Sequence, residues 1–250
     1  MNLEGKIPLI HIYCDNWCER CPFSDRCEMF AREQAWRDSK DSVTDNDVFE
    51  FVEKNLSEAL EKMMAYIEEK GIDLAAETDE EEDQTGATPS PNPELLEELI
   101  QISGVAKKYG SLSLKWIIDK NTMFEGYRDM LLQRQELGLA VDEYEVAELA
   151  NAVEEIQWYS HFVGAKVHRI ADQLQEPFYN DDIQSDANGS AKVVLIAIGR
   201  SIKSWEIMMR DFPEKMDEII TFLSSLQRLQ AVIQRLFPNA EAFHRPGFDD

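Results

Sequence analysis

Four cysteines near the N-terminus are the residues whose type and spacing point most directly to chemistry. Cys14, Cys18, Cys21 and Cys27 follow the spacing C-x3-C-x2-C-x5-C and are the only cysteines in the 250-residue chain. So compact a segment can turn four thiolates toward one point. We expect Cys27 in the first turn of a helix capped by Ser24, where free N–H groups stabilise negatively charged sulfur. Because four thiolates suit tetrahedral zinc or an iron–sulfur cluster, the sequence predicts one metal centre with these four ligands.

The spacing favours zinc but leaves the metal open. The segment contains one C-x2-C pair, and a structural zinc would supply folding energy to an N-terminal region with little core of its own. An iron–sulfur cluster is the alternative, since Tyr13, Trp17 and Phe23 could form an apolar shell around it. His11 is a further candidate ligand, although a lone histidine is more often a surface or packing residue. Unligated thiols or two reversible disulfides are the remaining interpretation.

A second group of chemical side chains falls on a predicted long helix and on the helix that follows it. The group comprises Glu154, Glu155, Tyr159, His161, Lys166, His168, Arg169 and Arg200. Most of its members lie on two stripes beside an apolar seam, and Arg200 interrupts an apolar run. Because a buried arginine needs a carboxylate, we expect an ion pair between Arg200 and Glu154 or Glu155. The alternative is a pocket for a small anion or substrate, formed by Arg200 with Lys166, Arg169 and His161.

Helices must position both groups, because apolar residues recur at intervals of three and four and strand-like alternation is rare. We predict an all-α fold, a multi-helix bundle with one very long helix at about 143–176 and an N-terminal four-cysteine segment. The other helices are expected at 24–39, at 45–70, from Pro93, from a cap at Ser111, from a cap at Asp186 or Asn188, and from about Pro213 to Leu236.

Two packing expectations accompany these helices. The helix 45–70 should bury an apolar face, which is formed by Val48, Val52, Leu56, Leu60, Met63 and Ile67. Gly164 and Gly199 should let neighbouring helices approach closely.

The predicted organisation has five parts. Residues 1–40 form the four-cysteine segment and first short helix, 45–70 a helix packed on the bundle, 71–93 an acidic proline-containing disordered linker, 94–237 the helical bundle and 238–250 a tail. The linker is expected to be disordered because like charges repel one another and its prolines forbid a helix.

The charge of the chain restricts its partners. With 49 acidic and 25 basic residues, the formal net charge is −24, which disfavours nucleic acid and anionic membranes and favours a basic protein or a cation. The first residues lack a basic and apolar export signal, so we expect a cytoplasmic protein with reduced cysteines. The oligomeric state is left open.

These observations predict a metal-binding, cytoplasmic helical protein with a binding or accessory role. The sequence has no phosphate-binding glycine loop, dinucleotide turn or nucleophile elbow. An iron–sulfur redox or enzymatic protein is the alternative, and an enzyme or binder of a small anion, acting through the helix-borne cations, is a further one.

Overall fold

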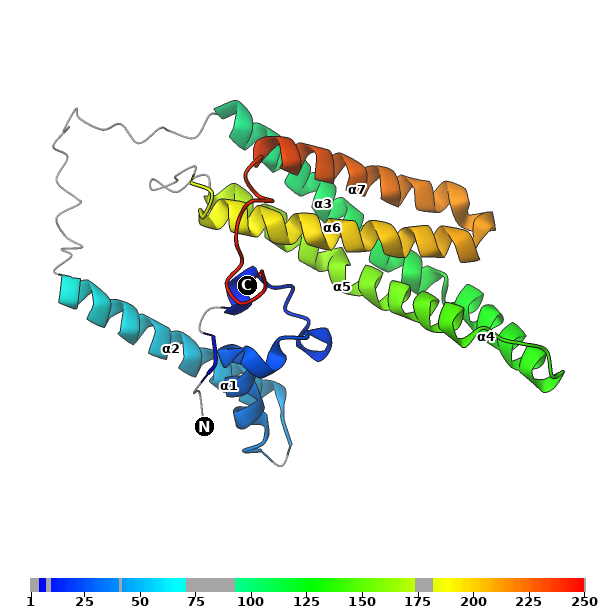
Figure 1. Ribbon diagram of the computed structural model, residues 1–250, viewed down its shortest axis with the longest axis horizontal. Helices are drawn as coiled ribbons and strands as arrows, with labels where there is room; N and C mark the ends of the chain where they lie inside the picture. The colour runs from blue at the N-terminus through cyan, green and yellow to red at the C-terminus, as the bar shows by residue number, and fades with distance from the viewer. Residues whose placement is uncertain (1–4, 8–9, 41, 71–92, 174–181, 250) are drawn as a thin grey trace. The chain divides into compact units, whose positions relative to one another are not determined.

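A computed structural model describes residues 5–7, 10–40, 42–70, 93–173 and 182–249, and it confirms the all-α fold class (Figure 1). Within these residues no strand forms, and Ile7 and Cys27 make one isolated bridge. The expected acidic linker and the expected end of the long helix lie at 71–92 and 174–181, outside the described residues. The chain divides into two compact units, which are residues 1–12 with 16–87, and residues 13–15 with 88–250.

The first unit contains two α-helices preceded by short 3₁₀ turns. The first helix, α1, spans Glu28–Arg37, and the second, α2, spans Asp45–Lys70. The helix expected from Ser24 is therefore shorter at its start, because Ser24–Arg26 form a separate 3₁₀ turn and Cys27 takes the cap position.

The two helices of this unit contact each other through one ion pair and one aromatic pair. Arg32 of α1 lies 3.3 Å from Glu58 of α2, and the rings of Trp36 and Phe51 lie 4.6 Å apart. These contacts use a different face of α2 from the apolar face predicted to be buried.

The expectation of a buried apolar face on α2 is wrong for the side chains that the structure describes. Val48, Val52, Leu56 and Leu60 are exposed by 43%, 56%, 60% and 48%. The side chains of Met63 and Ile67 lie outside the described set. The periodicity correctly indicated a helix, but it could not show whether another element covers that face.

The second unit is a bundle of four long helices with a fifth, shorter one at its end (Figure 1). The long helices are α3 (Pro93–Asp119), α5 (Glu143–Gln173), α6 (Asp186–Asp211) and α7 (Met216–Leu236), and the shorter one is α4 (Asn121–Glu136). The pairs that pack most extensively are α5 with α6 and α3 with α5. The predicted helix start at Ser111 is wrong, because α3 continues through this residue and ends at Asp119.

An apolar seam along α6 forms much of the bundle core. Its members Ala191, Val194, Ile198, Ser201, Trp205 and Met208 are all buried. An aromatic cluster fills the centre, where Trp205 stacks on Phe222 at 4.4 Å and donates its indole N–H to the Tyr109 hydroxyl at 3.1 Å. Met216, at the start of α7, is 43% exposed.

The closest helix approach occurs at Gly110 of α3. A Cβ atom at this position would lie 2.0 Å from the backbone oxygen of Ser160 on α5, so only glycine fits. Beside it, the hydroxyls of Ser113 and Ser160 share a buried hydrogen bond of 2.8 Å. Of the two glycines predicted for this role, Gly164 would place a Cβ in ordinary contact at 3.7 Å and Gly199 has nothing within 4 Å, so neither is required for close approach.

Candidate functional site

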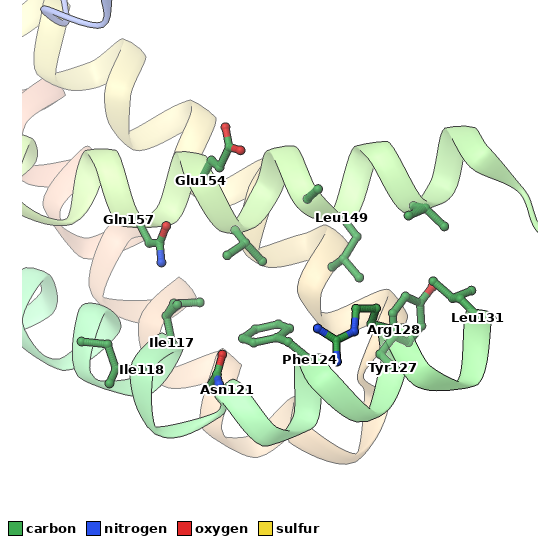
Figure 2. Close-up of a pocket in the computed structure, with 13 residues that line it drawn as sticks. Ile117, Ile118, Asn121, Phe124, Tyr127, Arg128, Leu131, Leu149, Glu154 and Gln157 are labelled. Atoms are coloured by element: carbon green, nitrogen blue, oxygen red, sulfur yellow. The ribbon is translucent and has the colours of Figure 1, made fainter. Parts of the chain in front are cut away.

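A groove on the second unit lies between the end of α3, α4 and the first half of α5. It encloses about 740 Å³. The lining residues are Ile117, Ile118, Asn121, Phe124, Tyr127, Arg128, Leu131, Val146, Leu149, Ala150, Val153, Glu154 and Gln157. We call it the α4–α5 groove. Figure 2 shows the Phe124 side chain pointing from α4 toward α5, with Leu149 on the opposite wall. Most of the lining is aliphatic or aromatic, so the groove favours an apolar occupant.

The groove exists because the chain turns between α3 and α4. The helical hydrogen-bond pattern is interrupted at Lys120, and α4 then lines the groove together with the N-terminal half of α5. Phe124 and Tyr127 of α4 pack edge-on against Phe212, at ring distances of 5.6 and 5.5 Å. A turn at Gly138, whose φ is +70°, leads the chain back toward α5. The same two rings therefore fix α4 against Phe212 and line the groove.

The helices that form the groove carry a strong negative charge. Residues 121–157 contain nine acidic and two basic side chains, a net charge of −7. Of the two arginines, Arg128 lies 3.0 Å from Asp129, and Arg134 donates to the carbonyl of Ala140. On α5, Glu148 pairs with Arg210 at 2.6 Å. The groove is therefore an apolar depression on an acidic surface.

The structure distributes the predicted helix-borne pocket residues over several surfaces. Glu154 lines the α4–α5 groove. Tyr159, Glu155 and Arg200 lie along the contact between α5 and α6. The remaining four, Lys166, Arg169, His161 and His168, divide into two pairs: the first pair lies near Asp186, and the two histidines line a smaller hollow between α5 and α3.

Arg200 is held by a carboxylate, but the partner is Asp15 and not either of the predicted glutamates. The guanidinium lies 2.7 Å from the Asp15 carboxylate and 2.6 Å from the Tyr159 hydroxyl, which itself donates to Asp15 at 2.6 Å. Glu155 instead accepts from Ser204 at 2.5 Å. Burial and the hydrogen bond to Asp15 raise the pKa of Tyr159 above its ordinary value, so the hydroxyl keeps its proton.

A second anchor lies two residues earlier, at Tyr13. Its hydroxyl donates to Asp186 at 2.8 Å, and Arg169 reaches the same carboxylate at 3.0 Å. The Tyr13 ring packs against Phe243 at 4.7 Å and over Gly189, where a Cβ would lie 2.5 Å from the ring. Burial and the Asp186 contact raise the pKa of Tyr13 to about 12. Segment 13–15 is thus fixed to the bundle on both sides of Cys14.

Lys166 lies near this anchored segment. Burial lowers the pKa of its ammonium group, and the neighbouring Arg169 lowers it further, whereas the Cys14 thiol and Asp186 act in the opposite direction. Sequence reasoning missed the roles of Tyr13, Asp15 and Asp186; Tyr13 and Asp15 adjoin Cys14, but no local pattern points to Asp186 as the partner of Tyr13 on the bundle.

The four predicted metal ligands are present as thiols, of which Cys27 is buried and the other three are half-buried. Cys18 and Cys21 form a tight turn in which the Cys21 N–H donates to the Cys18 carbonyl at 3.2 Å. The Cys27 sulfur accepts from the Phe30 N–H at 3.4 Å at the start of α1. In the part of the chain that the structure describes, no three or more His, Cys, Asp or Glu residues form a group that could hold a metal ion. The metal centre stays a prediction from spacing.

Comparison with known proteins identifies no family for this chain. No family model, no curated protein and no solved structure matches the chain. Among the described helices, none is both long and apolar enough to cross a membrane.

Proposed function

We propose that this chain is a binding protein with an accessory role, and that its α4–α5 groove receives an amphipathic helix with basic flanks from a protein partner. The observation that carries the proposal is the combination of an apolar groove of about 740 Å³ with a net charge of −7 on the segment that forms it. Amphipathic helices bind such grooves by placing side chains at i, i+3, i+4 and i+7 into the apolar floor.

The walls support a helical occupant in particular. α4 has 16 residues, which corresponds to about 24 Å of wall, or roughly the length of a four-turn helix. Apolar side chains make up most of the lining, Glu154 adds a carboxylate, and other carboxylates on α4 and α5, such as Glu125 and Glu145, are exposed. Lysine or arginine residues on the polar sides of a bound helix would face these carboxylates, which speeds encounter and disfavours acidic competitors.

Titration with model peptides tests this function. The probe is an 18-residue leucine–lysine amphipathic peptide with a fluorescent label, and its counterpart has glutamate in place of each lysine. We expect saturable binding of the lysine peptide that weakens with salt, and at least tenfold weaker binding of the glutamate peptide. Equal binding of the two peptides would contradict the proposed charge complementarity.

A matched pair of variants locates the binding. Leu131 lines the groove, whereas Leu132, the next residue on α4, is 51% exposed and does not line it. We expect Leu131→Gln to weaken binding at least fivefold and Leu132→Gln to leave it nearly unchanged. Circular dichroism must show equal helix content in both variants. If both lose binding equally, the peptide does not occupy the groove.

A second proposal concerns the cysteines. We propose that Cys14, Cys18, Cys21 and Cys27 bind one metal ion or cluster, with zinc preferred and an iron–sulfur cluster as the alternative. Two features support it: the tight turn brings Cys18 and Cys21 close along the chain, and the Cys27 sulfur accepts a backbone N–H at the start of a helix, where negative sulfur is stabilised.

Metal analysis of anaerobically purified protein, with a Cys18→Ser variant, tests this second proposal. One zinc per chain that is lost in the variant supports a structural zinc, and iron with matching sulfide supports a cluster with redox or enzymatic chemistry. Purified protein that contains neither zinc, nor iron, nor sulfide would refute the metal centre.

A further inference from the structure

A second, smaller hollow lies where α3 crosses α5, away from the α4–α5 groove. It encloses about 300 Å³. Lys107 and Ser111 line it from α3, and His161 and His168 line it from α5, with Ser160 and Gly164 beneath. We call it the α3–α5 hollow. Lys107 and Ser111 are one helical turn apart, and the two histidines are about two turns apart, so each pair projects from one face of its helix.

The floor of the hollow is rigid because the two helices touch there through their backbones. Gly110 leaves no room for a Cβ beside the Ser160 carbonyl, and Gly164 lies against the backbone of Ala106 and Lys107. The Ser160 hydroxyl is already used, since it donates to the Ile156 carbonyl at 2.5 Å and shares a hydrogen bond with Ser113. A ligand would therefore meet the side chains of the rim.

The charge of the rim is opposite to that of the chain. Every ionisable residue that lines the hollow is basic, although the chain carries 49 acidic against 25 basic residues. Two of the four histidines in the sequence lie here. A carboxylate beside the rim is that of Asp172 on α5, which lies 3.8 Å from the His168 ring nitrogen and is 58% exposed. This long, solvated contact leaves the other ring nitrogen of His168 available to a ligand.

We propose that the α3–α5 hollow binds a phosphate group, either as the free ion or as a small phosphomonoester. A tetrahedral oxyanion offers several acceptor oxygens, and Lys107, Ser111 and the two imidazoles offer donors from two directions. The volume of about 300 Å³ equals the lower end of ordinary ligand pockets, which suits a phosphate with a small organic substituent. This inference is independent of the partner helix, because the groove and the hollow share no lining residue.

Binding should strengthen as the pH falls. Imidazoles gain positive charge between about pH 8 and pH 5, and each added charge attracts the anion. The charged groups that face the histidines are Lys107 from α3 and Asp172 on α5. Sulfate is the better probe for this measurement, because its own charge does not change over that pH range.

Nuclear magnetic resonance titrations of the full chain test the proposal. The probe is inorganic phosphate at pH 6.5, with sodium chloride adjusted to hold the ionic strength constant. We expect saturable shifts of the Ser111, Gly164 and Ala165 amides. A sodium chloride titration alone is the comparison, and if it reproduces the same shifts, the hollow attracts only a general ionic atmosphere and the proposal fails.

Variants decide whether the rim residues hold the anion. Lys107→Gln and a double change of His161 and His168 to Gln should each weaken phosphate binding at least fivefold, and the double variant should lose the pH dependence of sulfate binding. Lys115→Gln on the same helix is the control, since Lys115 is exposed and pairs with Asp119. Unchanged affinity in the rim variants, or an equal loss in the control, overturns the proposal. Separate amide signals report folding, so an unfolded variant is recognised, and the more conservative Lys107→Arg then replaces Lys107→Gln and should retain binding.

Discussion

The contact between α3 and α5 makes a quantitative prediction at two glycines on the same helix. In Gly110→Ala the new Cβ would lie 2.0 Å from the Ser160 carbonyl oxygen, so the two backbones must separate by about 1 Å to reach an allowed distance. Gly104, also within α3, is exposed, and a Cβ added there would meet nothing within 4 Å. Both substitutions therefore bring the same gain in helix propensity. They differ only in whether the new Cβ meets the Ser160 backbone on α5.

The expected changes in the free energy of unfolding follow from helix propensity and from overpacking. Alanine in place of a mid-helix glycine stabilises by about 1 kcal/mol. Overpacking costs about 1–3 kcal/mol, and we expect the upper end for Gly110→Ala because backbone atoms cannot move aside as a flexible side chain can. The free energy of unfolding should thus fall by about 2 kcal/mol in Gly110→Ala and rise by about 1 kcal/mol in Gly104→Ala.

Thermal unfolding followed by circular dichroism measures this difference. A domain of this size shifts its Tm by about 2–4 °C per kcal/mol. We expect Gly110→Ala to melt roughly 4–8 °C lower than the unmodified chain and Gly104→Ala roughly 2–4 °C higher. A Gly110→Ala protein as stable as the Gly104→Ala protein would refute the backbone contact between α3 and α5, and with it the rigid floor of the α3–α5 hollow.

Two further predictions concern a buried tyrosine and a partly exposed ion pair. Burial raises the pKa of Tyr109 to about 12, so between pH 10 and 12 only the unfolded chain releases this proton and the free energy of unfolding falls as the pH rises. Urea titrations of Tyr109→Phe should show a shallower fall over this pH range, and an unchanged slope would contradict the reasoning. A double-mutant cycle with Asp15→Asn and Arg200→Gln should give a coupling energy of about 1 kcal/mol, because this ion pair is partly solvated. A coupling energy near zero would show that the ion pair does not hold segment 13–15 on the bundle.

The helices were predictable because their signals are local. The aligned apolar positions of α6 and the acceptor cap before α5 lie within a few residues of the structure that they specify. The failures are of another kind. Periodicity cannot show whether a neighbour covers the apolar face of α2, and a serine such as Ser111 is compatible with both a cap and a helix interior.

The candidate sites were less predictable because they depend on contacts between distant residues. Asp15 and Arg200 are 185 positions apart, and nothing near Arg200 indicates its partner. Helix geometry alone separates His161 from Lys166, since five residues correspond to about 140° around the axis. That rotation explains why the histidines face α3 while Lys166 lies near Asp186. The prediction of a single pocket was based on closeness in sequence and did not take into account the direction in which each side chain leaves the helix axis.

The α4–α5 groove follows from a mismatch between the lengths of two packed helices. α5 has 31 residues, and its apolar seam continues toward its N-terminus through Val153, Leu149 and Val146. α3 runs antiparallel to it, with Gly110 against Ser160, and ends at Asp119, so it cannot cover the start of that seam. α4 lies beside this part of the seam, where Leu149 is buried and Val146 and Val153 are half-buried, and its Phe124 and Tyr127 rings contact Phe212. An apolar helix in the groove would continue the packing that α3 leaves incomplete, which is the physical reason to expect a helical partner there.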